Sequence, residues 1–338
     1  MRSAVRFVLL AALLASSRLG ATVSDGSETL RNVVDVMIAF DLGAEELLAA
    51  RGLDAEELAD RQIDLANEAL ANSGLGDLFE FRLVRVATLG VRVRDYEIRA
   101  GETEAKHRFN WMIGQYRSVT ESPEDVEDPA WFDLATACEE VGADVLMAIV
   151  DTGCATGMTG LSNGLEVMDP RYPWNSPYLL DLYVPTAIGS CDLNAVLKGY
   201  TFQHELGHML GAGHASADQV NAASIPVGPQ LFSDSCAYLF DWGGTLHTTL
   251  MGYTYDGYGH DCERILCYST PELTFRDASG ADTGIPLGVA GRYDNVRAIR
   301  EAYPFVAQFR THVVRYGDWL VRTACGAGGT LKTSYDGL

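Results

Sequence analysis

Three histidines stand at fixed positions in the segment from His204 to His214, which reads HELGHMLGAGH. Residues four apart lie one above the other on a helix, so His204 and His208 project from one helical face. Glycine reaches positive φ angles without steric cost, so Gly211 and Gly213 can end the helix and turn the chain back. The segment therefore predicts a helix closed by a glycine bend, with all three imidazoles directed at one cation.

Three neutral imidazoles suit a zinc ion, because they leave it dipositive with a fourth position open for water. Glu205 follows the first histidine, and its side chain points about 100° further round the helix, towards that water. Zinc lowers the pKa of its bound water towards about 7, and a neighbouring carboxylate can take the proton during attack. The residues predict hydrolysis by a zinc-bound water, with Glu205 as the base and then as the acid for the leaving amine. A helix whose histidines only pack is the alternative, and five matched positions argue against it.

The motif resembles the signature of the metzincin zinc metallopeptidases, H-E-x-x-H-x-x-G-x-x-H. Metzincins also carry a methionine turn beneath the zinc, and the resemblance assigns that turn to Met251 in the sequence TLMGY. In astacin-like and serralysin-like members, the tyrosine two residues after the methionine approaches zinc and assists the oxyanion. The resemblance implies the same role for Tyr253, and a tyrosine that only packs is the alternative.

The rest of the chain resembles bacterial secreted reprolysin-like and peptidyl-Asp-metallopeptidase-like proteases over about residues 31 to 312. The segments that carry this resemblance are VVDVMIAF, FEFRLVRVA, GADVLMAIVDTGC, YSTPELTF and NVRAIREAYPFVAQFR. His214 is followed by Ala215, where reprolysins place an aspartate, and the segment 215–250 is long. Because of these two departures, no cleavage preference is carried over from the family.

The order of apolar strands and amphipathic helices predicts an α/β (α+β) fold with a mixed, twisted sheet. Asp54 with Glu57 forms a capping-box pattern that begins a helix, and Asn72 and Gly74 end it. One long helix from about Leu193 to Gly211 is expected to carry the histidines, and the chain beyond it is expected to be rich in loops. A C-terminal helix follows, with a kink at Pro304. The other expected elements are strands at Val33–Phe40, Phe79–Val86, Asp144–Val150 and Leu179–Val184, and helices at Ala130–Val141 and Asn295–Arg310.

The N-terminus has the composition of a signal peptide over residues 1–21, with Arg2 and Arg6 ahead of an apolar stretch and then small residues. We expect export, to the medium or the periplasm, and no membrane contact after cleavage, since no later stretch approaches about 18 apolar residues. A metzincin catalytic domain is expected over 31–312. Its upper subdomain covers about 31–211, its irregular lower subdomain covers about 212–312, and zinc lies at the floor of the cleft between them. Residues 313–338 form a C-terminal tail.

The net charge limits which partners the chain can bind, and the cysteine content predicts disulfide bonds. A formal net charge of −21 repels phosphate backbones and excludes nucleic acid as a partner. An exported chain meets an oxidising compartment, so the seven cysteines predict disulfides, with at least one thiol left unpaired. The expected pairs are Cys154–Cys191 and one pair among Cys236, Cys262 and Cys267.

Four acidic residues and two histidines outside the motif are further candidate ligands. The acidic pairs Glu124-Asp125 and Glu127-Asp128 lack the spaced pattern of a calcium loop, which favours solvated surface over a structural Ca²⁺ site. His247 and His260 flank the methionine turn, where either substrate binding or a structural role is open, and the structural role is favoured.

These features together predict a secreted zinc-dependent endopeptidase that hydrolyses peptide bonds within polypeptide substrates. One alternative is a secreted zinc-binding protein without catalysis, and the presence of Glu205 and Met251 argues against it. The other alternative is a zinc amidase acting on a small substrate, which would need a closed pocket. The sequence leaves the oligomeric state and the physiological substrate open.

Overall fold

The structure is a computed structural model, and it describes residues 32–96, 104–154, 160–162, 188–221, 230–307, 310, 312–316, 319–325 and 331–337. The chain divides into one unit from Arg31 to Arg310 and a second that joins Met1–Leu30 with Thr311–Leu338. In chain order, the described elements of the first unit are β1 (Asn32–Asp41), α2 (Leu42–Ala50), α3 (Ala55–Asn72), β2 (Phe79–Leu89), η1 (Val93–Asp95), α4 (Glu104–Glu121), η2 (Pro123–Asp125), α5 (Ala130–Val141), β3 (Val145–Val150), β4 (Gly160–Ser162), β5 (Ile188–Asp192), α7 (Leu193–Lys198), α8 (Thr201–Met209), β6 (Leu239–Trp242), β7 (Thr245–Thr248), β8 (Glu263–Arg264), β9 (Thr270–Arg276), β10 (Asp282–Leu287) and α9 (Asn295–Val306).

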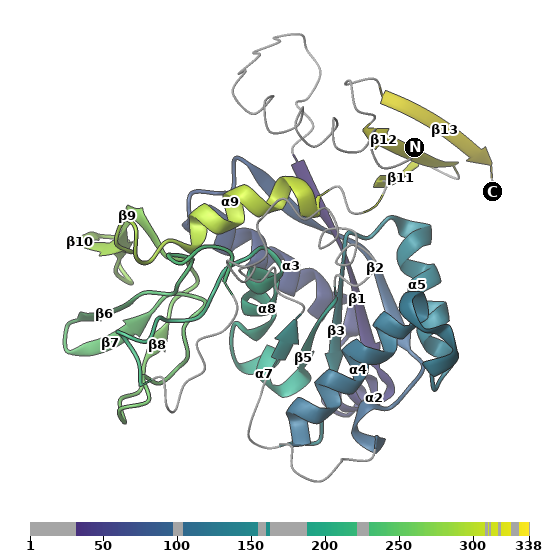
Figure 1. Ribbon diagram of the computed structural model, residues 1–338, viewed down its shortest axis with the longest axis horizontal. Coiled ribbons are helices and arrows are strands. Elements are labelled where there is room, and N and C mark those ends of the chain that lie inside the picture. Colours follow the sequence, from purple (N-terminus) through teal and green to yellow (C-terminus); the bar gives the residue numbers. More distant parts are fainter. Residues whose placement is uncertain are drawn as a thin grey trace. The chain divides into compact units, whose positions relative to one another are not determined.

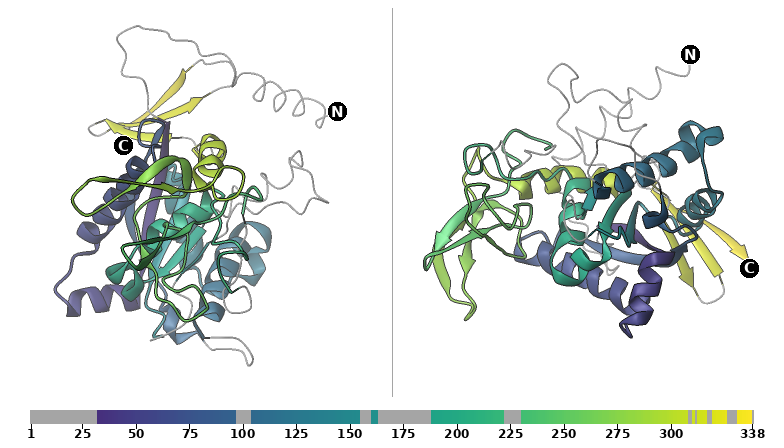
Figure 2. Two further views of the ribbon diagram at one scale, coloured as in Figure 1. Left: turned by 90° about the vertical axis from the view of Figure 1, so that its left-hand side faces the viewer. Right: turned by 90° about the horizontal axis from the view of Figure 1, so that it is seen from below.

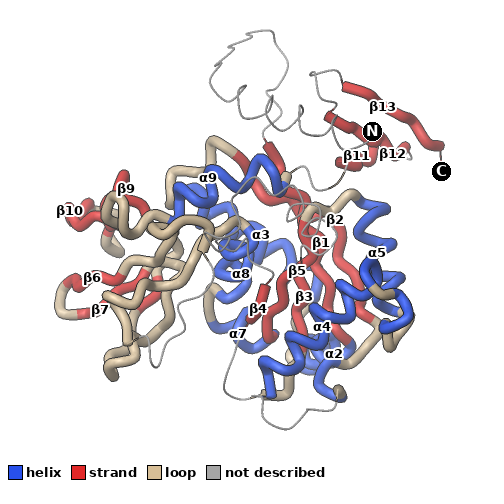
Figure 3. The backbone as a smooth tube through the Cα atoms, viewed as in Figure 1, coloured by secondary structure: helices blue, strands red, loops and turns tan. Residues whose placement is uncertain are grey.

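A five-stranded mixed sheet organises the first unit, in the order β2-β1-β3-β5-β4 (Figure 1, with β4 labelled in Figure 3). Strands β2, β1, β3 and β5 are parallel, whereas β4 runs antiparallel to β5 and forms one edge. Helices α2 and α3 connect β1 to β2, and α4 and α5 connect β2 to β3, as crossovers between parallel strands require (Figure 3). The expected mixed α/β fold is confirmed.

The two faces of the sheet bury different sets of side chains. In β1, Val34, Val36, Ile38 and Phe40 pack with α3 and α8, whereas Met37 and Ala39 pack with α4 and α5. This alternation follows from the two-residue period of a strand. Figure 2 shows helices on both sides of the sheet. Because both faces are covered, the parallel strands are apolar along most of their length, as in the fully buried sequence VLMAIV of β3.

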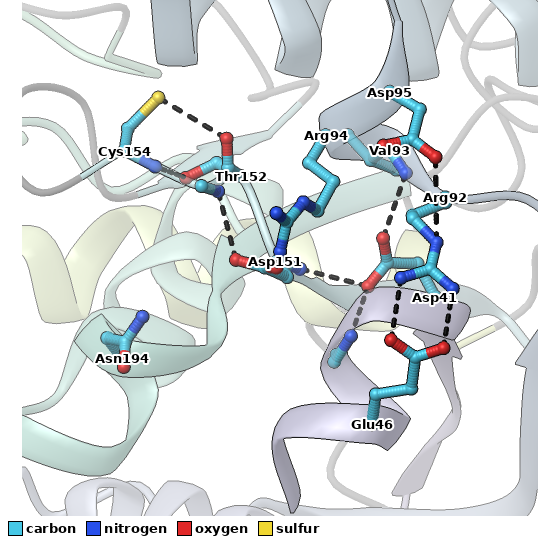
Figure 4. Close-up of polar contacts among 12 residues, drawn as sticks. Asp41, Glu46, Arg92, Val93, Arg94, Asp95, Asp151, Thr152, Cys154 and Asn194 are labelled. Carbon is cyan, nitrogen blue, oxygen red and sulfur yellow. Dashed lines mark hydrogen bonds and ion pairs between the residues drawn. The ribbon is translucent and has the colours of Figure 1, made fainter.

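Buried aspartates close the carboxyl ends of β1 and β3 (Figure 4). Asp41 ends β1 and accepts hydrogen bonds from the backbone amides of Ala44, Val93 and Asp151, at 2.8–2.9 Å. The Asp151 carboxylate in turn accepts a hydrogen bond from Arg94, at 2.9 Å. One carboxylate thus caps α2 and holds two neighbouring segments of backbone at the same end of the sheet.

Three expected elements differ from the structure. The single helix over Leu193–Gly211 is wrong: α7 ends at Lys198 and α8 begins at Thr201, because Gly199 between them is extended, with φ −164° and ψ −161°. The last helix of this unit contains Pro304 but ends at Val306 rather than Arg310. The strand expected at Leu179–Val184 lies outside the described residues, and the described strand that precedes α7 is β5.

The chain between α8 and α9 contains more regular structure than the expected loops. It forms a three-stranded sheet of β6, β7 and β8 and a two-stranded sheet of β9 and β10. In the second unit, β11 (His312–Tyr316), β12 (Trp319–Cys325) and β13 (Leu331–Gly337) form an antiparallel sheet, where the sequence predicted only a tail. Among the residues that the structure describes, no helix has the length and apolarity to cross a membrane.

The expected disulfides are not formed among the six cysteines from Cys138 to Cys267, which are all free thiols. The proposed Cys154–Cys191 pair is wrong because the two side chains pack on opposite faces of the sheet. The expected pair among Cys236, Cys262 and Cys267 is absent as well. The thiols of Cys236 and Cys267 instead donate hydrogen bonds to Gln230 Oε1 and to the carbonyl oxygen of Asn72, at 3.1 and 3.3 Å.

Candidate metal centre

The three histidines of the motif converge in the structure. His204 and His208 lie on α8 and are buried, with 6% and 7% of their surface exposed. The Nε2 atom of His214 lies 3.0 Å from Nε2 of His204 and 2.8 Å from Nε2 of His208. Of the His, Cys, Asp and Glu side chains that the structure describes, these three form the group whose donor atoms could hold a metal ion.

The outer nitrogen of each ring has its own partner. Nδ1 of His204 donates to the carbonyl oxygen of Leu250 at 3.1 Å, and Nδ1 of His208 donates to that of Ala212 at 2.9 Å. Nδ1 of His214 lies 3.2 Å from the hydroxyl of Tyr253. Such contacts fix the ring orientation and the tautomer of metal-binding histidines.

These hydrogen bonds determine which ring nitrogens carry hydrogen, and therefore which kind of ligand can bind between the rings. A carbonyl only accepts, so the hydrogens of neutral His204 and His208 reside on Nδ1 and their Nε2 atoms are bare lone pairs. Both lone pairs face His214 Nε2, which carries at most one hydrogen. Burial keeps the rings neutral, since it lowers the pKa of His204 well below its ordinary value and that of His208 to about 4. Converging lone pairs of neutral imidazoles fit a cation such as zinc.

The bend that returns His214 is built from glycine and one buried amide. Gly211 has φ +81°, and a Cβ there would lie 2.7 Å from Cβ of Leu231, so glycine is needed for both reasons. Asn295, at the start of α9, accepts a hydrogen bond from the Gly213 amide at 2.9 Å and donates one to the Gly213 carbonyl at 3.1 Å. The C-terminal helix thus holds the bend in place from outside the motif.

Met251 packs directly beneath the helix that carries the histidines. The residue is fully buried, and a Cβ added to Gly207 would overlap its Sδ atom. Gly207 lies between His204 and His208 on α8, so the thioether contacts the helix at the level of the two rings. The neighbouring Leu250 carbonyl is the acceptor for His204 Nδ1, which connects the turn to the first imidazole.

Glu205 is enclosed between α8 and the edge strand. Only 4% of its surface is exposed, and Ser162 of β4 donates a hydrogen bond from Oγ to Glu205 Oε2 at 2.9 Å. Burial raises the pKa of the Glu205 carboxyl to about 8, and the Ser162 hydrogen bond and the positive charge of Arg264 offset part of that rise. A carboxyl held in this way is suited to exchange a proton near neutral pH.

Arg264 of β8 lies near the site although nothing in the motif pointed to it. Its Nε atom donates to the Gly252 carbonyl at 2.9 Å, directly after the methionine. Its charge contributes to lowering the pKa of His204 and opposes the rise in the pKa of Glu205. Ser162, Arg264 and Asn295 were all missed in the sequence, because each reaches the site from a segment outside the motif and none has a local pattern.

The remaining candidates lie apart from the three histidines. His247 Nε2 is 3.6 Å from the Glu263 carboxylate, and His260 Nδ1 is 2.6 Å from that of Asp256. Neither histidine belongs to the group that could hold a metal ion. Of the acidic residues considered for calcium, Glu124, Asp125 and Glu127 are exposed and Asp128 is half-buried.

Comparison with known proteins gives weak similarity. No protein-family model matches the chain, and no curated protein matches it. A solved chain described as "Structure of a chaperone-substrate complex" is 19% identical, with a TM-score of 0.49, and the match covers 83% of this chain and 35% of that chain. Metalloproteinase-II from Bacteroides fragilis is 15% identical, with a TM-score of 0.31, and the match covers 56% of this chain and 46% of that one. The chain therefore spans less than half the length of either protein.

Proposed function

We propose that this chain is a secreted, zinc-dependent endopeptidase of the metzincin type that hydrolyses peptide bonds within polypeptides. The observation that carries the proposal is the convergence of three Nε2 atoms on one point, with the buried carboxylate of Glu205 on the same helix. His204, His208 and His214 would hold the metal. When bound, zinc supplies a Lewis acid that polarises the scissile carbonyl and makes water acidic.

Three side chains of the protein supply the other proposed roles, which are proton transfer, orientation of a histidine ring and support of the helix. Glu205 accepts a proton from the attacking water and passes it to the leaving amine, so it acts first as a base and then as an acid. Tyr253, whose hydroxyl lies 3.2 Å from Nδ1 of His214, orients that ring, and its second proposed role is to donate a hydrogen bond to the oxyanion. Met251 supports the helix from below.

A digest of casein with the purified protein tests the proposal. We expect cleavage at internal peptide bonds that stops on addition of a zinc chelator and returns when zinc is restored. Cleavage that continues unchanged in the chelator would remove the zinc mechanism. Hydrolysis of small amides but not of casein would indicate an amidase, and zinc binding with neither activity would indicate a non-catalytic binding protein. Detection of the mature chain in the medium, starting after about residue 21, tests the proposed export.

A further inference from the structure

The edge strand β4 presses against the carboxyl group of Glu205. Gly160 and Ser162 are two residues apart in this strand, so both lie on the same strand face. The Ser162 hydroxyl donates to Glu205 Oε2 at 2.9 Å. A Cβ added to Gly160 would lie 2.8 Å from Glu205 Cδ and would overlap Oε1. Ser162 thus binds Oε2 of Glu205, and Gly160 leaves room for Oε1.

The position of β4 is fixed by the sheet rather than by Glu205. Gly160, Leu161 and Ser162 pair with Cys191, Ser190 and Gly189 of β5 in an antiparallel ladder. The buried Ser190 also donates from Oγ to the Leu161 carbonyl at 3.0 Å. The hydroxyl of Ser162 is therefore presented to the carboxylate from a strand that is paired with the sheet.

We propose that Ser162 is a positioning residue, which orients the Glu205 carboxylate for proton transfer, with Gly160 providing the space that this orientation needs. The inference rests on the proposed role of Glu205 as the base. The torsion that rotates a glutamate carboxylate is broad and roughly two-fold, so the plane of the group is poorly fixed by its own side chain. The hydroxyl carries one hydrogen, which engages Oε2 and leaves the lone pairs of Oε1 to receive a proton.

Kinetics on variants of the zinc-loaded, full-length protein test this role. In Ser162→Ala we expect kcat on a casein-derived peptide to fall about fivefold to twentyfold, with KM changed less than about twofold, because the lost contact orients the base and does not bind substrate. Ser162→Thr keeps a hydroxyl and should recover most of the loss. Gly160→Ala, which forces Glu205 to move, should lower kcat further than Ser162→Ala.

A matched control separates positioning from loosening of the strand. Ser190→Ala removes a different side-chain hydrogen bond to β4 and leaves the Ser162–Glu205 contact in place, so it should lower the thermal midpoint while kcat stays near the wild-type value. Equal losses of kcat in Ser162→Ala and Ser190→Ala, or no rescue by Ser162→Thr, would overturn the proposal. Zinc content should be one ion per chain in every variant.

A second measurement does not depend on activity. Crystal structures of the zinc-loaded wild type and Ser162→Ala should show the Glu205 carboxylate rotated or in two conformers only in the variant. An unmoved carboxylate would overturn the role of Ser162. A wild-type protein with no zinc-dependent cleavage would refute the proposed function, and the positions of the Glu205 carboxylate in the two crystal structures would still decide whether Ser162 orients it.

Discussion

Glu205 is the side chain on which the proposed chemistry depends, and its substitution can be separated from loss of the metal. Glu205→Gln keeps the shape of the side chain but removes its ability to accept a proton, so we expect turnover to fall at least about 100-fold. The three imidazoles are untouched, and zinc content should remain that of the wild type. Kinetics with metal analysis on the same samples measure both effects.

The matched control for this prediction is Glu263→Gln. Glu263 follows the methionine turn, but its side chain is 70% exposed and its carboxylate contacts His247 rather than the three histidines. This variant should cleave casein at the wild-type rate. Turnover within a few-fold of the wild type in Glu205→Gln would assign the base to another group.

The sequence predicted the residues of the site where spacing alone determines geometry. A helical period brings His204 and His208 together, and a glycine bend can return His214, so these positions could be anticipated. Ser162 and Asn295 could not, because each is brought to the site by tertiary pairing, across sequence separations of 43 and 82 residues. The partners that orient a predicted site are therefore harder to find than its ligands.

Gly207 in helix α8 packs closely against Met251, so we expect its replacement by alanine to destabilise the protein although alanine favours helices. Alanine exceeds glycine in helix propensity by about 1 kcal/mol, so Gly207→Ala would ordinarily stabilise a helix. Here the new Cβ would overlap Met251 Sδ and lie 2.8 Å from Cε1 of Tyr268. We expect the free energy of unfolding to fall by about 1–3 kcal/mol, as in other overpacked cores.

Gly114 in α4 is the control for this prediction, because a Cβ there would meet no atom within 4 Å beyond its chain neighbours and the backbone of its own helix. Gly114→Ala should raise the free energy of unfolding by up to about 1 kcal/mol. Denaturant unfolding of both variants measures the difference. If Gly207→Ala were as stabilising as Gly114→Ala, the packing of the methionine against the helix would be looser than the structure indicates.

Asp41 at the junction of β1 and α2 predicts a pH dependence of stability. Burial raises its pKa from 3.8 to about 6, even though three backbone amides favour the ionised form. A carboxyl whose folded-state pKa is raised contributes stability below pH 3.8 that is lost as pH rises through 6, and the full difference is about 3 kcal/mol.

Asn cannot titrate, so Asp41→Asn should remove this contribution as well as disturbing the hydrogen bonds. We expect the variant to be less stable than the wild type at both pH 4.5 and pH 7.5, with a destabilisation about 2 kcal/mol smaller at pH 7.5. Urea unfolding at each pH measures the free energy of unfolding of both proteins. A chelator is present throughout, so that metal release does not contribute to the difference. A destabilisation that is equal at both pH values, or larger at pH 7.5, would mean that the amide hydrogen bonds lower the pKa of Asp41 at least as much as burial raises it.

The elements show where local sequence signals are sufficient and where they are not. The helix over Ala130–Val141 and the start of the strand at Phe79 match the structure, because their apolar period is clear. The break at Gly199 was missed, since the surrounding residues favour a helix and one extended glycine decides the outcome. The short strands β6 to β10 were missed because such short segments carry little periodic signal and form through pairing.

For the whole molecule, the position of the three histidines links metal binding to stability. They join α8, the glycine bend and, through Leu250 and Asn295, the methionine turn and the last helix of the first unit. A metal held at this junction binds the folded chain and not the unfolded one. At a free metal concentration 1,000 times the dissociation constant, the stabilisation is about 4 kcal/mol. For a unit of this size that corresponds to a thermal midpoint higher by on the order of 10 °C.

Calorimetry with zinc and with excess chelator measures this shift in the thermal midpoint. Two histidine variants test whether the shift comes from metal bound at the three histidines. His214→Ala removes one ligand, so the midpoint of this variant should respond little to either addition. His260→Ala removes a ring whose side chain is 70% exposed and which lies outside the group, so it should keep the full wild-type shift. An equal shift in His214→Ala and the wild type would place the metal elsewhere in the chain. No shift in the wild type would mean that the three converging imidazoles do not hold zinc, and the hydrolytic mechanism would then lose its basis.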